Sequence, residues 1–262
     1  FWDAALENFG LETDVAVTLK SLRRKELIYR LDNSAFEEAR QYIFKHALLS
    51  DVTYNTLLLR ERKNLHKKTA EWLITAAGER KAENAAVIAE HLEKSESFGE
   101  AADWYGRAGQ QAAASYAHQA AALFYQKALD CHSKISEKDE NLQQVVGWLR
   151  GLGEAFYSQA NFPASIEAYL KMAETAEISG DKINQTKALH LVSASQFESS
   201  DFQSALETAE KSVRSGEQAG DSREAQAELS LALYRLGRTH LALCNYAEAI
   251  SLGEKSIEVA EK

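Results

Sequence analysis

The pattern of apolar and polar positions divides the chain into two parts. From about residue 60 onward, apolar side chains recur at helical spacing in segments that are separated by short polar or glycine-containing turns. Pro163 is the only proline, so few positions interrupt a helix. We predict helices over residues 60–77, 83–95, 98–114, 117–131, 141–160, 162–179, 183–199, 202–219, 222–243 and 246–261.

An internal repeat runs through this helical part of the chain. Asn161–Ser165 aligns with Asp201–Ala205 at a shift of 40 residues, and a further shift of 44 reaches Asn245–Ala249. A repeat of this length indicates stacked helix pairs, which bury their apolar faces only against their neighbours. We therefore predict about five helix pairs over residues 59–262.

Small and aromatic residues recur at fixed spacings within these units. A small residue in the first helix is followed 12 positions later by a second one, then by an aromatic residue four positions on. Two units follow this pattern in full: Gly109, Ala121 and Tyr125, and Gly153, Ser165 and Tyr169. A third unit has Gly237 and Ala249 but carries Gly253 in place of the aromatic residue. The spacing resembles the tetratricopeptide repeat (TPR), which implies an α-solenoid whose inner helices line a binding groove.

The first 58 residues have a different pattern. A short amphipathic helix is predicted over residues 14–25, followed by strands at 27–30 and 42–44 and by a helix from Ala47 onward. The order helix, strand, loop, strand, helix is similar to the end of a winged-helix domain. The predicted fold class is all-α: a TPR-like α-solenoid over residues 59–262, preceded over residues 1–58 by the C-terminal part of a winged-helix domain with a small β-hairpin.

The N-terminal segments also resemble a family of bacterial signalling proteins. FWDAALENFG, LKSLRRKELI and YIFKHALLSDVTYNTLLLRERKNLHKKTAEWL are similar to the region after the ATPase core of STAND-type ATPases, some of which are fused to class III adenylate/guanylate cyclase domains. A phosphate-binding loop is absent from the sequence. Because Met172 is the only methionine, we expect the chain to be a fragment of a longer protein. The resemblance implies that the longer protein binds ATP or ADP, and we expect the fragment to have no cofactor of its own.

His46 lies where the second predicted strand ends and a helix begins. Phe44-Lys45-His46-Ala47 is similar to the Met-His-Asp segment of related STAND proteins, with Ala47 in place of the aspartate. The resemblance implies that His46 contacts the phosphate of bound ADP in the longer protein, and a helix N-terminus suits a phosphate. The alternative is a structural histidine that fills a corner of the core.

Charge and cysteine usage exclude several classes of function. The net charge of −9 is uneven, because residues 1–75 carry +1 and residues 76–262 carry −10. A surface this acidic does not suit nucleic acid. No apolar run is long enough to span a membrane, and Cys131 and Cys244 fit a reducing cytoplasm. Neither a metal-ligand spacing nor a catalytic motif is present, so we expect a non-enzymatic chain.

The repeat register predicts which side chains face the groove of the solenoid. They combine charged and aromatic groups, which suit a protein or peptide partner: Arg150, Glu154, Tyr157, Lys187, His190, Phe197, Glu198, Tyr234 and Arg238. The resemblance implies a regulatory region that senses a protein or small-molecule signal and passes it to an upstream ATPase domain of the same polypeptide, and to a cyclase. A plain TPR scaffold and the sensor region of a transcriptional regulator remain as alternatives.

Overall fold

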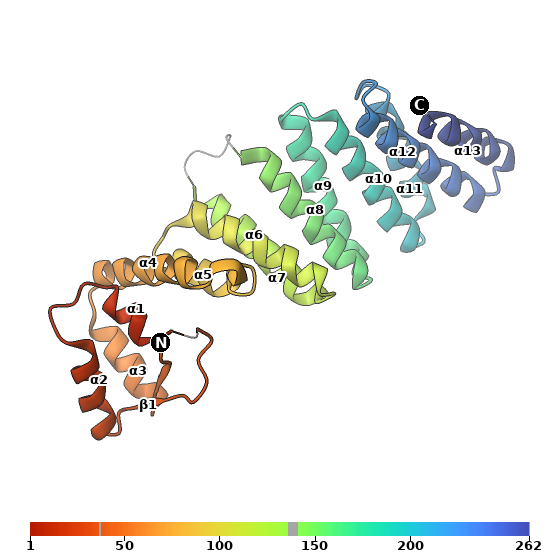
Figure 1. Ribbon diagram of the computed structural model, residues 1–262. Coiled ribbons are helices and arrows are strands. Elements are labelled where there is room, and N and C mark those ends of the chain that lie inside the picture. Colours follow the sequence, from red (N-terminus) through yellow and green to blue (C-terminus); the bar gives the residue numbers. More distant parts are fainter. Residues whose placement is uncertain (37, 136–140, 262) are drawn as a thin grey trace. The chain divides into compact units, whose positions relative to one another are not determined.

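Short helices and a small hairpin make up the beginning of the chain, whereas long paired helices make up the rest. The computed structural model describes residues 1–36, 38–135 and 141–261, which form two units, Phe1–Ala108 and Gly109–Lys262 (Figure 1). The elements of the first unit are α1 (Asp3–Glu7), α2 (Val15–Arg24), β1 (Ile28–Arg30), β2 (Tyr42–Phe44), α3 (Ala47–Thr56), α4 (Leu59–Ala76), the 3-10 turn η1 (Gly78–Lys81) and α5 (Ala85–Lys94).

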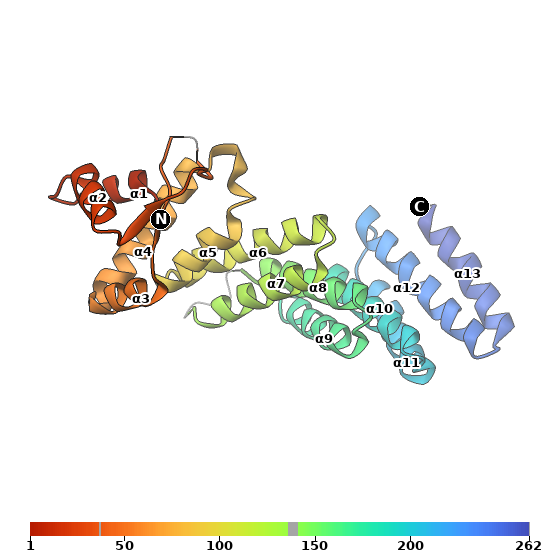
Figure 2. The same cartoon turned by 90° about the horizontal axis from the view of Figure 1, so that it is seen from below.

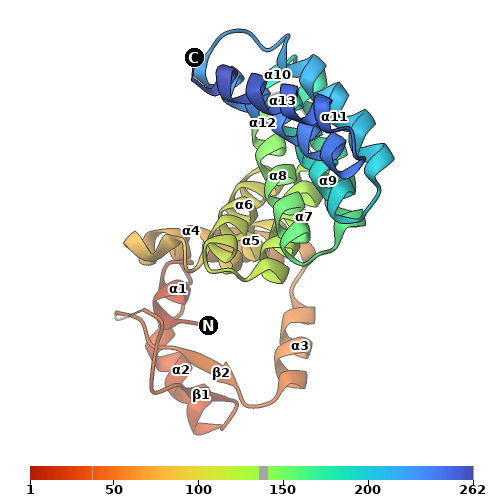
Figure 3. The same ribbon diagram turned by 90° about the vertical axis from the view of Figure 1, so that its right-hand side faces the viewer.

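The predicted hairpin is present in the first unit. β1 and β2 pair antiparallel, with Ile28 opposite Phe44 and Arg30 opposite Tyr42, and the hairpin lies beside α2 (Figure 3). Val15 and Leu19 of α2 pack against Ile28 and Tyr42 in one buried cluster. The predicted order of helix, strand, strand and helix is therefore confirmed, while the winged-helix assignment and the boundary at residue 58 stay predictions.

An aromatic cluster joins distant parts of the first unit. The rings of Trp2, Phe36 and Trp72 lie with their centroids 5.1–5.5 Å apart. Such pairs add to the apolar area that they bury. The cluster links the beginning of the chain, the loop between the strands, and α4.

Antiparallel helices stack in the second unit. Figure 2 shows successive helices side by side from α8 onward. The helix α6 (Phe98–Ala114) ends in this unit. The helices that follow are α7 (His118–Ser133), α8 (Leu142–Ser158), α9 (Phe162–Ile178), α10 (Lys182–Glu198), α11 (Phe202–Gly216), α12 (Arg223–Ala242) and α13 (Tyr246–Ala260). The predicted helices and the all-α solenoid are confirmed.

Capping side chains begin several of these helices. The side chains of Asn161, Asp181, Asp201 and Ser222 each accept a hydrogen bond from a backbone N–H in the first turn of α9, α10, α11 and α12. Each cap satisfies a donor that the helix leaves unpaired. The Asn-Phe and Asp-Phe pairs of the repeat therefore begin helices.

Small residues allow the helices to approach closely at the positions that the TPR spacing predicts. A Cβ atom at Gly153 would lie 2.4 Å from the ring of Tyr169, and one at Gly109 would lie 2.8 Å from the ring of Tyr125. Ser165 is fully buried at the equivalent crossing. Each tyrosine ring thus occupies space that a glycine leaves open.

Candidate functional site

The predicted groove residues lie on the alternate helices α8, α10 and α12. Arg150, Glu154 and Tyr157 are on α8, and Tyr234 and Arg238 are on α12. The other four, on α10, are Lys187, His190, Phe197 and Glu198. Because α10 packs against α12 and contacts α8, these helices form one face of the second unit. We call it the inner face.

A buried charge cluster joins α10 to α12 on the inner face. Glu228 accepts a hydrogen bond from Lys187 Nζ at 2.6 Å through one carboxylate oxygen, and its other oxygen lies 2.8 Å from Nε2 of His190. His190 is only 4% exposed. His190 therefore lies beneath the inner face, and Lys187 alone of this cluster reaches its surface.

The pKa of Glu228 reflects this environment. Burial by itself raises the pKa of the carboxyl group, but hydrogen bonds from His190 and Lys187 and the positive charge of Lys187 outweigh it. The pKa is consequently held below its usual value, and the carboxylate stays charged at neutral pH. The sequence analysis did not include Glu228, which lies 41 positions after Lys187 and 38 positions after His190.

A second charge pair lies nearer the ends of α10 and α12. Arg238 donates to Glu198 at 3.0 Å, and its guanidinium group lies 4.1 Å from the ring centroid of Phe197. The ring of Phe197 also meets Phe202 edge-on. A cation above an aromatic ring and beside a carboxylate is held in one orientation. The structure therefore brings three predicted residues together here, on a partly exposed surface.

The α8 residues form a more open part of the inner face. Arg150 and Glu154 lie 3.7 Å apart, one helical turn from each other, and both are exposed. Tyr157 packs edge-on against Phe162. Tyr234, on α12, is also exposed and lies beside the guanidinium group of Arg235. These side chains are accessible to a ligand.

Three buried polar atoms on α10 and α12 have no hydrogen-bond partner among the described residues. They are Nδ1 of His190, Oε1 of Gln196 and Nε of Arg235. An unpaired buried polar group costs about 1–3 kcal/mol.

His46 lies at the beginning of α3, as predicted. It is the N-cap residue, and its carbonyl oxygen accepts hydrogen bonds from the backbone N–H groups of Leu49 and Ser50. Its side chain is exposed. The exposed position does not fit the alternative in which His46 fills a corner of the core.

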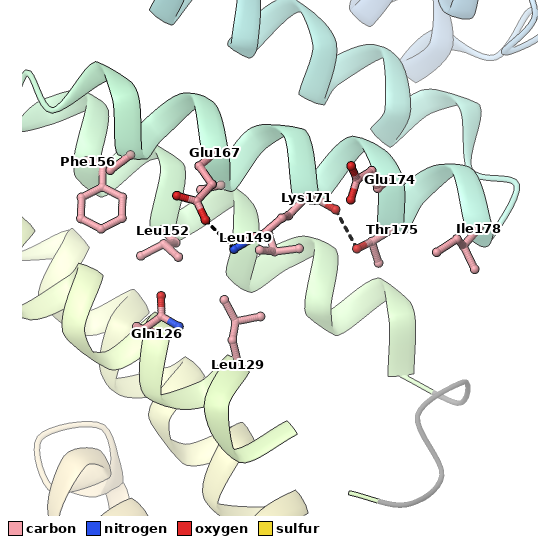
Figure 4. Close-up of a pocket in the computed structure, with 12 residues that line it drawn as sticks. Gln126, Leu129, Leu149, Leu152, Phe156, Glu167, Lys171, Glu174, Thr175 and Ile178 are labelled. Carbon is pink, nitrogen blue, oxygen red and sulfur yellow. Dashed lines mark hydrogen bonds and ion pairs between the residues drawn. The ribbon is translucent and has the colours of Figure 1, made fainter. Parts of the chain in front are cut away.

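A hollow lies on the second unit between α7 and α9, and the sequence did not predict it. Its volume is about 460 Å³, and Leu149, Leu152 and Phe156 of α8 line it (Figure 4). Glu167 and Lys171 of α9 form an ion pair of 2.7 Å beside these apolar side chains. The signal in the sequence that could have predicted this hollow is the set of apolar residues on α8 outside the predicted groove.

Two kinds of feature are missing from the described part of the chain: a cluster of metal-binding side chains and a membrane-spanning helix. No group of three or more histidine, cysteine, aspartate or glutamate side chains there could hold a metal ion. None of its helices is both long and apolar enough to cross a bilayer.

Comparison with known proteins identifies the fold of the chain but does not identify a family. No protein-family model matches the sequence, and no curated protein sequence matches it. The fold is similar to that of BtubC (BKLC) from P. vanneervenii, with 16% identity and a TM-score of 0.55 over 78% of this chain and 91% of BtubC.

Two further solved structures have a similar fold. The apo form of RapI has 12% identity and a TM-score of 0.58, and the alignment covers 82% of this chain and 58% of RapI. YrrB, a TPR protein with an unusual peptide-binding site, has 18% identity and a TM-score of 0.51, over 83% of this chain and 94% of YrrB. The chain therefore has a TPR-like fold.

Proposed function

We propose that the chain is a regulatory protein-interaction module that binds a basic or amphipathic peptide segment on the inner face of α8, α10 and α12. The observation that carries the proposal is the partly exposed group of Phe197, Glu198 and Arg238, which offers a fixed ring and a fixed carboxylate. Fixed groups bind with less loss of entropy than mobile ones.

The acidic charge of the helical part of the chain favours a basic ligand. Residues 76–262 carry a net charge of −10, and Glu154 and Glu198 both lie on the inner face. Complementary charge speeds encounter and selects against acidic partners. YrrB, with its peptide-binding site, has a similar fold, which supports testing peptide binding first.

The test uses peptides selected from a display library on the immobilised chain. Glu154→Lys with Glu198→Lys should weaken binding at least about tenfold, because two attractive contacts become repulsive. The dependence of affinity on salt should also decrease. The matched control, Glu207→Lys with Glu210→Lys, makes the same change of net charge on α11. Equal effects of both pairs would show that the inner face is not the binding site.

We further propose that the chain is the sensor region of a STAND-type signalling ATPase. The resemblance of residues 1–77 motivates this proposal, and two observations support it. His46 is exposed at the beginning of α3, and Leu48 and Val52 of the same helix are exposed apolar side chains. An ATPase domain that covered α3 would bury these groups and bring a bound nucleotide to His46. Adenylate or guanylate cyclase would be the output domain.

His46→Ala in the ATPase-containing protein tests this second proposal. Loss of a hydrogen bond to phosphate costs about 1.5–3 kcal/mol, so ADP affinity should fall about tenfold to hundredfold. The melting temperature should change little, because the side chain is exposed. Unchanged ADP affinity would contradict the proposal and favour the plain TPR scaffold. A DNA-binding output domain would favour the transcriptional regulator.

A further inference from the structure

Arg238 carries the charge expected of the ligand, although it belongs to the chain itself. Its guanidinium group donates to the Glu198 carboxylate at 3.0 Å and lies 4.1 Å from the ring centroid of Phe197. The ring and the carboxylate are on α10, whereas Arg238 reaches them from α12. A positively charged side chain therefore already occupies the two groups that the proposed function offers to a basic ligand.

The repeat indicates that this charge pair is not required for the helices to stack. A shift of 40 residues places Ser158 of α8 onto Glu198, and the shift of 44 places Ala194 of α10 onto Arg238. The contact between α8 and α10 thus has a serine and an alanine where the contact between α10 and α12 has a carboxylate and a guanidinium group. The pair is an addition to the repeat, which points to a role in recognition.

The aromatic ring, in contrast, is common to two repeats. Phe197 meets Phe202 edge-on with centroids 5.1 Å apart, and Tyr157 meets Phe162 in the same way at 5.6 Å. Phe202 therefore holds the ring of Phe197 whether or not a guanidinium group covers it. Removal of Arg238 would leave a fixed ring beside a carboxylate, and such a surface attracts a cation.

The ring and the carboxylate together favour a guanidinium group over an ammonium group. A guanidinium group is planar, so it stacks on an aromatic face while its N–H groups donate to a carboxylate beside the ring. An ammonium group is a compact, strongly hydrated charge without a flat face. The side chain of Arg238 is 33% exposed, so it can leave the site without separation of α10 from α12.

We propose that the ligand of the inner face places an arginine side chain on Phe197 and Glu198 and displaces Arg238. This inference rests on the proposed function and adds the chemical group that is recognised. In the free chain Arg238 acts as an internal competitor, which lowers the affinity for any ligand by the fraction of molecules in which the site is open. A basic peptide without a suitably placed arginine does not displace it, so the competitor also provides specificity.

The probe is N-acetylarginine N-methylamide, which carries the guanidinium group without the rest of a peptide. In NMR titrations, Arg238→Ala should bind this probe at least about tenfold more tightly than the unaltered chain, because the competitor is gone. N-acetyllysine N-methylamide should bind the same variant at least about fivefold more weakly than the arginine probe. Arg238→Ala combined with Glu198→Gln should lose most of the gain, because the carboxylate is removed.

Arg214→Ala is the matched control. It removes the same charge from α11, where Arg214 lies 3.7 Å from Glu210 and outside the inner face. Its affinity for the arginine probe should stay within about twofold of that of the unaltered chain. Arg238→Ala should fold, since alanine is the residue at the equivalent position on α10, Ala194. Melting curves check this expectation.

The peptides selected on the immobilised chain separate failure of this inference from failure of the proposed function. Arg238→Ala should tighten their binding about tenfold, and replacement of the peptide's arginine by lysine should remove this gain. The inference is overturned, and the proposed function stands, if Arg238→Ala weakens peptide binding that Glu154→Lys with Glu198→Lys also weakens. Arg238 would then contact the ligand rather than compete with it.

A second result would also overturn the inference. If the arginine probe binds Arg238→Ala and the unaltered chain equally, Arg238 only joins α12 to α10. If charge reversal on the inner face acts no more strongly than the same change on α11, the proposed function fails. The arginine probe alone then decides whether Phe197 and Glu198 take a guanidinium group.

Discussion

Residues 109–262 bury many of their apolar side chains between helices, whereas the helix α3 buries none of its own. In the second unit, Ala205, Ala209 and Leu233 are fully buried between neighbouring helices. None of the ten residues of α3 is buried, and Leu48 is 73% exposed. Both segments are helical, so helix formation alone does not explain the difference.

The difference lies in the number of neighbouring elements that pack against each helix within the chain. The repeat supplies every helix from α8 to α12 with a helix on each side, and small residues let these helices approach. α3 contacts β2 but presents Leu48 and Val52 to solvent. Exposed apolar patches of this kind mark surfaces that bind other proteins. The repeats are therefore stabilised internally, whereas α3 leaves its apolar side chains exposed among the described residues.

The largest expected effect comes from one leucine in each segment. Leu233→Ala should lower the free energy of unfolding by about 2–5 kcal/mol, because it leaves a cavity in a closely packed core. Leu48→Ala should change it by less than about 0.5 kcal/mol, since an exposed side chain loses little on truncation. Urea denaturation of both variants measures the difference. Equal losses would show that α3 is packed in solution as the repeats are.

Sequence reasoning located the helices of the repeats closely, for a physical reason. Each unit repeats the same contacts, so a residue such as Tyr169 has counterparts whose spacing is visible in the sequence. The predicted helices at 162–179 and 246–261 end within two residues of α9 and α13. Capping residues such as Asp201 mark where these helices begin.

The candidate site was less predictable, because it depends on pairs between repeats. The spacing placed His190 on the inner face, but only the structure shows that Glu228 buries and binds it. The exposure of Ile257 on α13 was also missed. The same pattern predicts burial on α11 and α13, and only the presence of a covering helix distinguishes Val213 from Ile257.

A second prediction compares the acid stability of the two units. Nδ1 of His66 lies 2.9 Å from Nδ1 of His91, between α4 and α5. Burial, with the nearby charges of His66 and Lys94, lowers the pKa of His91 to about 4. The unfolded chain takes up this proton near pH 6.5, so the first unit should lose stability as the pH falls from 6.5 to 4. The expected loss is about 2–3 kcal/mol.

Glu228 gives the second unit a different pH window. Its pKa lies below the usual value of 4.5, so its contribution is present above pH 4.5 and is lost only as the pH falls further. Hydrogen exchange at pH 5 should therefore increase in α4 and α5 before it increases in α10 and α12. His91→Asn should remove most of the pH dependence in the first unit. Simultaneous loss of protection in both units would contradict this assignment.

The smallest expected effect tests whether close approach is what distinguishes the repeats. Gly147 and Gly153 lie on the same helix, but a Cβ atom at Gly147 would meet nothing within 4 Å, whereas one at Gly153 would lie 2.4 Å from the buried ring of Tyr169. Gly147→Ala should stabilise the protein by up to about 1 kcal/mol through helix propensity. Gly153→Ala should destabilise it by about 1–3 kcal/mol through overpacking. If the cause is the tyrosine ring, Gly153→Ala combined with Tyr169→Leu should be less destabilising than the sum of the single changes. Additive losses in urea denaturation would place the cost elsewhere than in this contact.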